Sequence, residues 1–148
     1  MEVTLTNIRK YFGSVKANDG ISFTLEAGKI YGLLGENGAG KSTLMKILSG
    51  YQAQDSGEIM LDGVVHSFES PAQALNCGIG MIYQDPHDVP SMRVLDNYLL
   101  GRNSGIKLDR DEGKGELLAT AKRMGFPIDL KAYIDTLSLG ERQQLGVA

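Results

Sequence analysis

The sequence contains a single cysteine, Cys77, no apolar run approaching the ~20 residues that span a bilayer, and no excess of positive charge. One cysteine cannot form an internal disulfide, which fits a reducing compartment. The first residues lack the charged-then-apolar pattern of a signal peptide. A net charge of −3 supplies no basic field for nucleic acid or an acidic membrane surface. For this chain of 148 residues, these absences predict a globular protein of the cytoplasm, unless a partner holds it at a membrane.

The strongest motif that is present runs from Gly35 to Thr43 and reads Gly-Glu-Asn-Gly-Ala-Gly-Lys-Ser-Thr. It lies between an apolar run, residues 30–34, and a helix-like stretch that begins at Leu44. It therefore meets the pattern G-x-x-x-x-G-K followed by S or T, in the strand–loop–helix context that a phosphate-binding loop requires. Its glycines let the backbone approach phosphates, and its N–H groups form an anion nest at a helix N-terminus. The motif predicts a nucleoside triphosphate ligand with Mg²⁺.

Within this loop, Lys41 is predicted to reach the β- and γ-phosphates, and the Ser42 hydroxyl to ligate Mg²⁺. A glycine-rich turn without a ligand would not need Lys-Ser-Thr at this offset. The residues of the loop predicted to bind the nucleotide are Gly35, Asn37, Gly38, Ala39, Gly40, Lys41, Ser42 and Thr43.

Strand-like segments dominate the chain to about residue 84, and helix-like segments follow. We expect strands at residues 3–8, 21–25, 30–34, 57–61 and 78–83 from their apolar patterns. We expect helices after Lys41 to about residue 49, and at residues 71–76, 94–100, 111–124 and from 140 or 141 to 148. Asp62-Gly63 predicts a tight turn after the fourth strand. The sequence contains no internal repeat.

A second motif, Leu137-Ser138-Leu139-Gly140-Glu141-Arg142-Gln143-Gln144, begins the last predicted helix. By itself it indicates a helix N-terminus with Ser138 as a possible N-cap. Together with the phosphate loop, it makes the whole chain resemble the nucleotide-binding domain of the ATP-binding cassette (ABC) family. The motif resembles that family's signature, Leu-Ser-Gly-Gly-Gln. Leu139 stands for the usual glycine and Glu141 for the glutamine, while Ser138 and Gly140 keep their positions.

The resemblance implies roles for residues outside the loop. Phe12, just before Gly13, corresponds to the aromatic that stacks on adenine; simple packing of Phe12 remains open, and Tyr11 is the weaker candidate. Gln84 matches the family's Q-loop glutamine, which touches Mg²⁺ or the attacking water. Lys41 and Gln84 would be the catalytic residues, and Ser42 and Gln84 the metal ligands. The signature residues Ser138, Gly140 and Glu141 would contact nucleotide.

The resemblance also implies an α/β fold, a P-loop ATPase cassette that is incomplete here. Residues 1–87 would form a β subdomain with part of the ATPase core, and residues 88–148 a helical subdomain with the signature. The family's Walker B carboxylates and switch histidine are missing, since His66, His87, Asp85 and Asp88 all precede the signature and cannot take those places. We therefore expect a truncated chain that binds nucleotide at most, with a bare apolar edge on the 30–34 strand.

Within the family, the phosphate loop and the stretch from Ser70 to Gln84 look most like importers of simple sugars or nucleosides. Two such domains, as a homodimer or tandem cassettes, would sandwich ATP, with Lys41 of one facing Ser138 and Gly140 of the other. Transmembrane permease subunits would dock near Gln84 on the cytoplasmic face of the membrane, with a solute-binding protein as an indirect partner and no nucleic acid. Two alternatives stay open: a non-hydrolysing regulatory module, and a non-transport member such as a translation factor.

Overall fold

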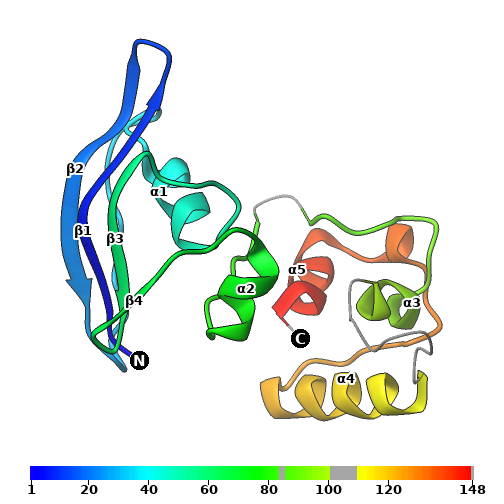
Figure 1. Ribbon diagram of the computed structural model, residues 1–148. Helices are drawn as coiled ribbons and strands as arrows, with labels where there is room; N and C mark the ends of the chain where they lie inside the picture. The colour runs from blue at the N-terminus through cyan, green and yellow to red at the C-terminus, as the bar shows by residue number, and fades with distance from the viewer. Residues whose placement is uncertain (84–85, 101–109, 148) are drawn as a thin grey trace. The chain divides into compact units, whose positions relative to one another are not determined.

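The computed structural model describes residues 1–83, 86–100 and 110–147 (Figure 1). The chain forms two units, Met1–Met81 and Ile82–Ala148, and each is described by itself. The division into subdomains 1–87 and 88–148 inferred from the sequence remains a prediction. Gln84 and Asp85 lie outside the described residues. Among the described residues, no helix has both the length and the apolar character needed to cross a membrane.

The first unit contains a four-stranded antiparallel sheet in the order β2-β1-β3-β4. Its strands are β1 (Val3–Phe12), β2 (Val15–Leu25), β3 (Ser56–Leu61) and β4 (Val64–His66). The first two are longer than the predicted 3–8 and 21–25, because the hairpin continues through mostly exposed residues to a turn at Gly13 (φ +58°). Backbone pairing between β1 and β2 forms this extension, and such pairing leaves no apolar pattern in the sequence. The predicted turn at Asp62-Gly63 is confirmed, with positive φ at both residues.

The inner face of β1 changes register halfway along the strand. Val3 and Leu5 are buried at odd positions, but the next buried residue is Ile8. Between them the pairing with both neighbours is irregular, and Asn7 has φ +54°. An extra residue of this kind turns the following side chains to the other face of the sheet. The irregularity therefore keeps Ile8 in the core.

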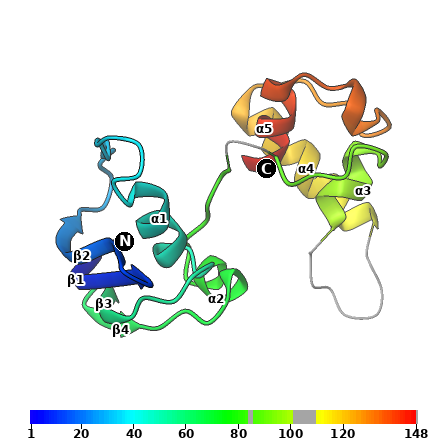
Figure 2. The same ribbon diagram turned by 90° about the horizontal axis from the view of Figure 1, so that it is seen from above.

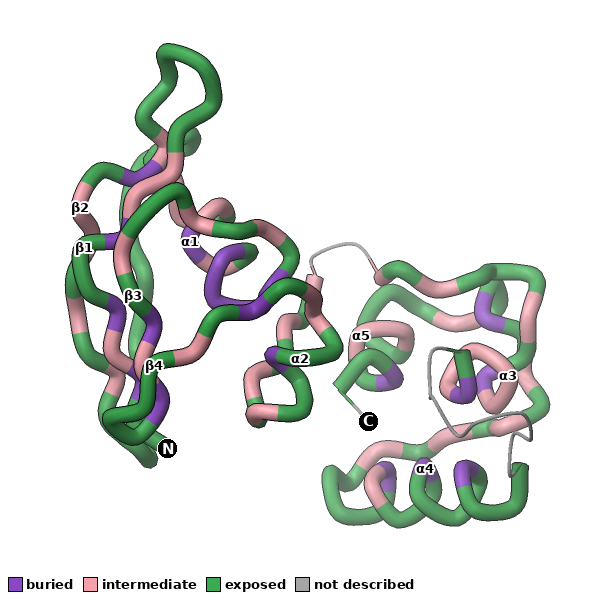
Figure 3. Tube along the Cα trace, in the orientation of Figure 1, coloured by how far each residue is buried: buried purple, intermediate pink, exposed green. Residues whose placement is uncertain are grey.

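Helix α1 (Lys41–Leu48) covers the buried face of this sheet (Figures 1 and 2). Its apolar residues Leu44, Ile47 and Leu48 join one core cluster with residues of β1 and β3, coloured as buried in Figure 3. Each such side chain stabilises the fold by about 1.5–3 kcal/mol on burial. The short helix α2 (Pro71–Asn76) has the predicted bounds and adds Ala74 to the cluster, and the structure shows Ser70 as its N-cap. The phosphate loop thus precedes a helix that is anchored through its buried side.

Two predicted strands are wrong. Residues 30–34 and 78–83, all of which the structure describes, form no strand. Ile30 and Leu34 are almost fully exposed, with relative accessibilities of 102% and 92%. An apolar run becomes a strand only where its N–H and C=O groups pair with a neighbour. Strands β1 to β4 pair with one another and leave these two segments outside the sheet.

The second unit is helical, with α3 (Val94–Leu99), α4 (Arg110–Met124), a 3₁₀ turn (Ile134–Thr136) and α5 (Leu139–Val147). Its core consists of Val94, Leu117, Ile134 and Leu145. Helix α4 includes two glycines near its start, and a methyl group added at Gly113 would lie 2.4 Å from Leu99 of α3. Gly113 therefore permits the close contact of α3 with α4, which explains a residue of low helix propensity there.

Candidate functional site

The phosphate loop wraps around the side chain of Lys41. The Lys41 ammonium donates hydrogen bonds to the carbonyl oxygens of Gly35 and Glu36, each at 2.7 Å. Gly38 and Gly40 have φ of +87° and +83°, conformations that other residues adopt only with strain. Gly40 is the N-cap of α1, and the first turn of this helix contains no acidic residue. Its N–H groups and positive helix end are thus arranged for an anion.

The described loop residues fit a nucleotide phosphate with Mg²⁺. Ser42 lies exposed in the first turn of α1, and Asn37, Gly38 and Ala39 are exposed in the loop itself, while Thr43 is half-buried. No cluster of three or more metal-binding side chains occurs among the described residues. Mg²⁺ in such sites takes few protein ligands and binds mainly phosphate oxygens and water. The single hydroxyl of Ser42 at the loop is therefore sufficient as the protein's ligand to Mg²⁺ there.

The end of the loop rests directly on β2. A methyl group at Gly40 would lie 2.0 Å from the carbonyl oxygen of Ala17. The next residue of the strand, Asn18, is 4% exposed and donates from Nδ2 to the Gly40 carbonyl oxygen at 3.3 Å. The sequence analysis made no prediction for Asn18, which lies between the two predicted strands at residues 3–8 and 21–25. Its importance depends on a contact across 22 residues.

Phe12 and Tyr11 lie at the tip of the β1–β2 hairpin, in the same unit as the loop. Phe12 is 49% exposed and lies outside the core cluster, with the Lys10 ammonium 5.8 Å from its ring centroid. Tyr11 donates its hydroxyl to Asp19 at 3.0 Å, and this hydrogen bond is the main cause that raises the pKa of Tyr11. Phe12 thus presents the more accessible apolar ring of the two.

The signature segment begins helix α5 with a capping box. Glu141 accepts hydrogen bonds from the Ser138 backbone N–H at 2.8 Å and from the Ser138 hydroxyl at 2.7 Å. The Glu141 N–H donates in return to the Ser138 hydroxyl oxygen at 3.3 Å. The hydrogen bond from the Ser138 hydroxyl is the largest cause that holds the pKa of the Glu141 carboxyl below its usual value, and the bond from the Ser138 N–H is the next. The predicted N-cap role of Ser138 is confirmed, and α5 begins one residue earlier than expected, at Leu139.

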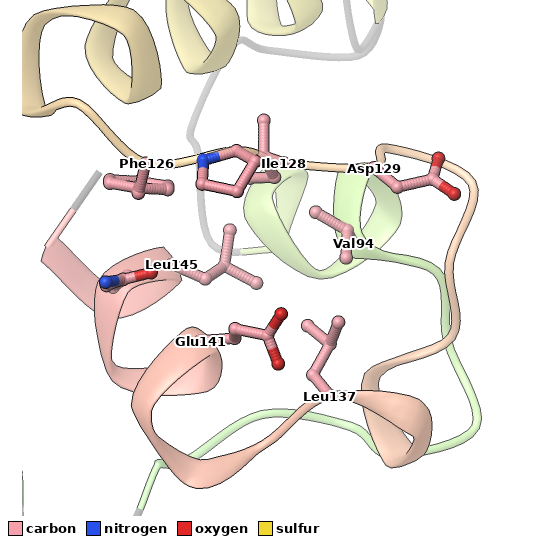
Figure 4. Close-up of a pocket in the computed structure, with 9 residues that line it drawn as sticks. Val94, Phe126, Ile128, Asp129, Leu137, Glu141 and Leu145 are labelled. Atoms are coloured by element: carbon pink, nitrogen blue, oxygen red, sulfur yellow. The ribbon is translucent and has the colours of Figure 1, made fainter.

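A hollow of about 330 Å³ lies beside this capping box in the second unit (Figure 4). Its wall is mostly apolar and includes Val94, Ile128, Leu137 and Leu145, with the Glu141 carboxylate directed toward its interior. Gly140 is exposed, and a methyl group there would meet no atom within 4 Å. The first turn of α5 is therefore accessible from outside the unit.

The structure brings the predicted loop residues and Phe12 into one unit and the signature residues Ser138, Gly140 and Glu141 into the other. Gln84, predicted as catalytic and as a metal ligand, lies outside the described residues. His66 stacks on Phe68 with ring centroids 5.9 Å apart, and His87 packs edge-on against Tyr83 at 4.6 Å. Both histidines thus have packing roles in the described structure.

Sequence comparison with known proteins finds the ABC transporter family and import ATP-binding proteins. The ABC transporter family model matches residues 18–148. The nucleoside import ATP-binding protein NupA of Lactococcus lactis is 38% identical over 147 residues, which are 98% of this chain and 29% of that protein. The ribose import ATP-binding protein RbsA of Chromobacterium violaceum is 42% identical over 152 residues, covering 100% of this chain and 30% of that protein. The chain thus spans less than a third of the length of these relatives.

Solved structures give the same family. A nucleotide-free ATP-binding cassette from an ABC transporter matches with a TM-score of 0.79 and 28% identity, covering 99% of this chain and 64% of that one. The ADP conformation of MJ1267, another ATP-binding cassette of an ABC transporter, matches with a TM-score of 0.81 and 26% identity, covering 99% and 63%.

Proposed function

This chain belongs to the ABC transporter family and has the α/β fold of part of its ATP-binding cassette, and we propose that it binds Mg-ATP as part of the ATP-binding subunit of an importer for a simple sugar or nucleoside. The observation that carries this proposal is the Lys41-centred loop at the N-terminus of α1. The two relatives named above support the choice of solute class, since one is named for nucleoside import and the other for ribose import.

The loop residues would act on the triphosphate by electrostatics and position. The Lys41 ammonium would exchange the carbonyl oxygens of Gly35 and Glu36 for the β- and γ-phosphate oxygens. The N–H groups of the first turn of α1 would donate to the phosphates, and the Ser42 hydroxyl would hold Mg²⁺, with Gln84 as the second expected ligand. Phe12 would stack on the adenine, and a stacking contact binds a base with little demand on the identity of that base.

A second nucleotide-binding domain would complete the site. Ser138, Gly140 and Glu141 would contact the nucleotide held by Lys41 of that domain, in a homodimer or in tandem cassettes. Permease subunits would hold the protein on the cytoplasmic face of the membrane and receive the solute from a binding protein. In phosphoryl transfer, a positioned water is needed besides the phosphate cradle. This chain's residues supply the cradle, so we propose nucleotide binding by the chain alone without useful turnover.

Titration calorimetry of the 148-residue chain with Mg-ATP tests this proposal. Lys41→Ala should weaken binding at least about tenfold, because a charge-assisted contact to phosphate is lost. Lys46→Ala, an exposed lysine later on the same helix, is the matched control and should bind like the unaltered chain. Equal affinity of the Lys41→Ala variant and the unaltered chain, or no binding by either, would overturn the proposal. A turnover rate above that of Lys41→Ala would overturn the part that denies hydrolysis.

A further inference from the structure

Asn18 is one of two buried polar residues among the described ranges, the other being Ser49. It lies on β2 opposite Lys10 of β1, so its backbone belongs to the sheet. The Ser49 hydroxyl has an obvious local use, since it donates to the Met45 carbonyl of its own helix. The Asn18 amide instead reaches across to Gly40, the N-cap of α1. Its burial therefore needs an explanation outside its own strand.

The Gly40 carbonyl oxygen accepts two hydrogen bonds. One comes from the Leu44 N–H at 2.9 Å and is the first bond of the helix. The other comes from Asn18 Nδ2 at 3.3 Å and ties the helix start to the sheet. This carbonyl and the Lys41 N–H belong to one planar peptide group, so holding the carbonyl also orients that N–H at the head of the first-turn peptide groups. Those groups carry the N–H donors that a phosphate would meet at the helix N-terminus.

Packing alone does not account for an asparagine at this position. Within the described part of the chain, no donor reaches Asn18 Oδ1, which is buried. A buried acceptor without a partner is unfavourable, so an apolar side chain of the same shape, leucine, would fill this space without that cost. What leucine would lack is the Nδ2 bond to Gly40. That bond is the feature that distinguishes asparagine here.

We propose that Asn18 is a positioning residue for the phosphate loop, holding the N-cap carbonyl of α1 so that the first-turn N–H groups face the phosphates. The inference rests on the proposed nucleotide site for its functional meaning. Its structural part, the hold of Asn18 on the loop end, can be tested without nucleotide. The two parts are therefore separable by experiment.

Amide hydrogen exchange of the full 148-residue chain tests the structural part. In Asn18→Leu, exchange at Ala39 to Leu44 should accelerate about three- to tenfold, the range that one neutral hydrogen bond supports. Exchange in the β1–β3 pairs should not change. Ser22→Ala is the matched control, since it removes another side-chain hydrogen bond of β2, to the Asn7 N–H, away from the loop. Unchanged loop exchange in Asn18→Leu would overturn the proposal, whether or not the chain binds nucleotide.

Inorganic pyrophosphate and Mg-ADP test the functional part. Affinity for both should fall about three- to tenfold in Asn18→Leu, while Ser22→Ala keeps the affinity of the unaltered chain. Loop exchange that accelerates without loss of affinity would overturn the positioning role while leaving the nucleotide site intact. Binding that is lost in Lys41→Ala and kept in Asn18→Leu would likewise overturn the positioning role of Asn18 and leave the nucleotide site intact. If the unaltered chain binds neither probe, the proposed function fails, and the inference fails with it.

Asn18→Asp supplies a pH readout that a packing role would not move. A protonated carboxyl can donate to the Gly40 carbonyl oxygen as the amide does, whereas an ionised carboxylate cannot. The ratio of loop exchange between this variant and the unaltered chain should therefore be near one at low pH. It should rise with increasing pH as the carboxyl loses its proton, and burial moves that transition above the usual value near 3.9. A ratio independent of pH would overturn the proposal, and this variant also replaces Asn18→Leu should that one not fold.

Discussion

Arg142 of α5 and Asp88 form a bidentate ion pair, with Nε 2.7 Å from Oδ2 and Nη2 2.5 Å from Oδ1. The Asp88 side chain is 11% exposed and that of Arg142 26%. In the sequence, Asp88 is a carboxylate that precedes the signature, and the structure adds that it forms an ion pair with the helix of the signature segment. The Asn97 side chain of α3 accepts a hydrogen bond from the N–H of the next residue, Val89, and donates one to the carbonyl oxygen of Val89. The segment at residues 88–89 is thus fastened to both α3 and α5.

Replacing Asp88 by Asn should lower the midpoint of thermal unfolding of the chain by about 3–6 °C, because the negative charge is lost and the amide keeps only one of the two acceptor oxygens. Arg142→Lys should do nearly as much, since a lysine cannot form the planar two-bond pair. Asp96→Asn is the control, because its ion pair with Arg110 is more exposed on the arginine side. Circular dichroism at 222 nm measures all three. An unchanged midpoint in Asp88→Asn would show that the pair contributes nothing.

The Glu141 capping box should make the stability of α5 depend on pH. The pKa of the Glu141 carboxyl is lowered in the folded state. Its contribution to the free energy of unfolding is therefore present above the unfolded-state pKa of about 4.3 and is lost as the pH falls through the folded-state pKa. Glu141→Gln should therefore be less stable than the unaltered chain at pH 7, and the gap should close below about pH 4. Glu58→Gln, an exposed carboxylate of β3, is the control. A gap that is constant from pH 7 to pH 3 would contradict the role of the ionised carboxylate.

The two glycines of α4 should respond in opposite ways to alanine. At Gly115 an added methyl group meets no atom within 4 Å, so alanine should stabilise the chain by about 0.5–1 kcal/mol through its higher helix propensity. At Gly113 it would lie 2.4 Å from Leu99, and the displacement of that side chain should cancel or reverse the gain. Urea denaturation measures both. Equal gains at the two positions would mean that α3 moves aside freely.

The two aromatic residues at the hairpin tip should differ in their effect on nucleotide. Phe12→Ala should weaken Mg-ATP binding about tenfold, because stacking on the base is lost. The same variant should leave the affinity for pyrophosphate unchanged. Tyr11→Phe keeps the ring and removes the hydrogen bond to Asp19, and it should bind ATP as the unaltered chain does. Equal loss for ATP and pyrophosphate in Phe12→Ala would point to a damaged hairpin instead of a lost stacking contact.

Several features could be predicted because the interactions that form them lie within a few residues of one another. The phosphate loop leads into α1, Pro71 begins α2, and Asp62-Gly63 makes the hairpin turn. Ser138 and Glu141 are three residues apart and form their cap by themselves. Glycine, proline and capping side chains act on their own neighbours, so their effects can be read along the chain.

Features that depend on distant partners became visible once the chain was folded. Residues 30–34 have the apolar pattern of a strand, but a strand needs a neighbour to pair with, and β1 to β4 pair among themselves. Asn18 meets Gly40 across 22 residues, and Asp88 meets Arg142 across 54. Patterns along the chain were enough to predict the family, the helix that follows the phosphate loop and the Ser138 cap. Strand pairing, the hold of β2 on the loop and the ion pair on α5 arose from folding, because a residue's pattern does not name its distant partner.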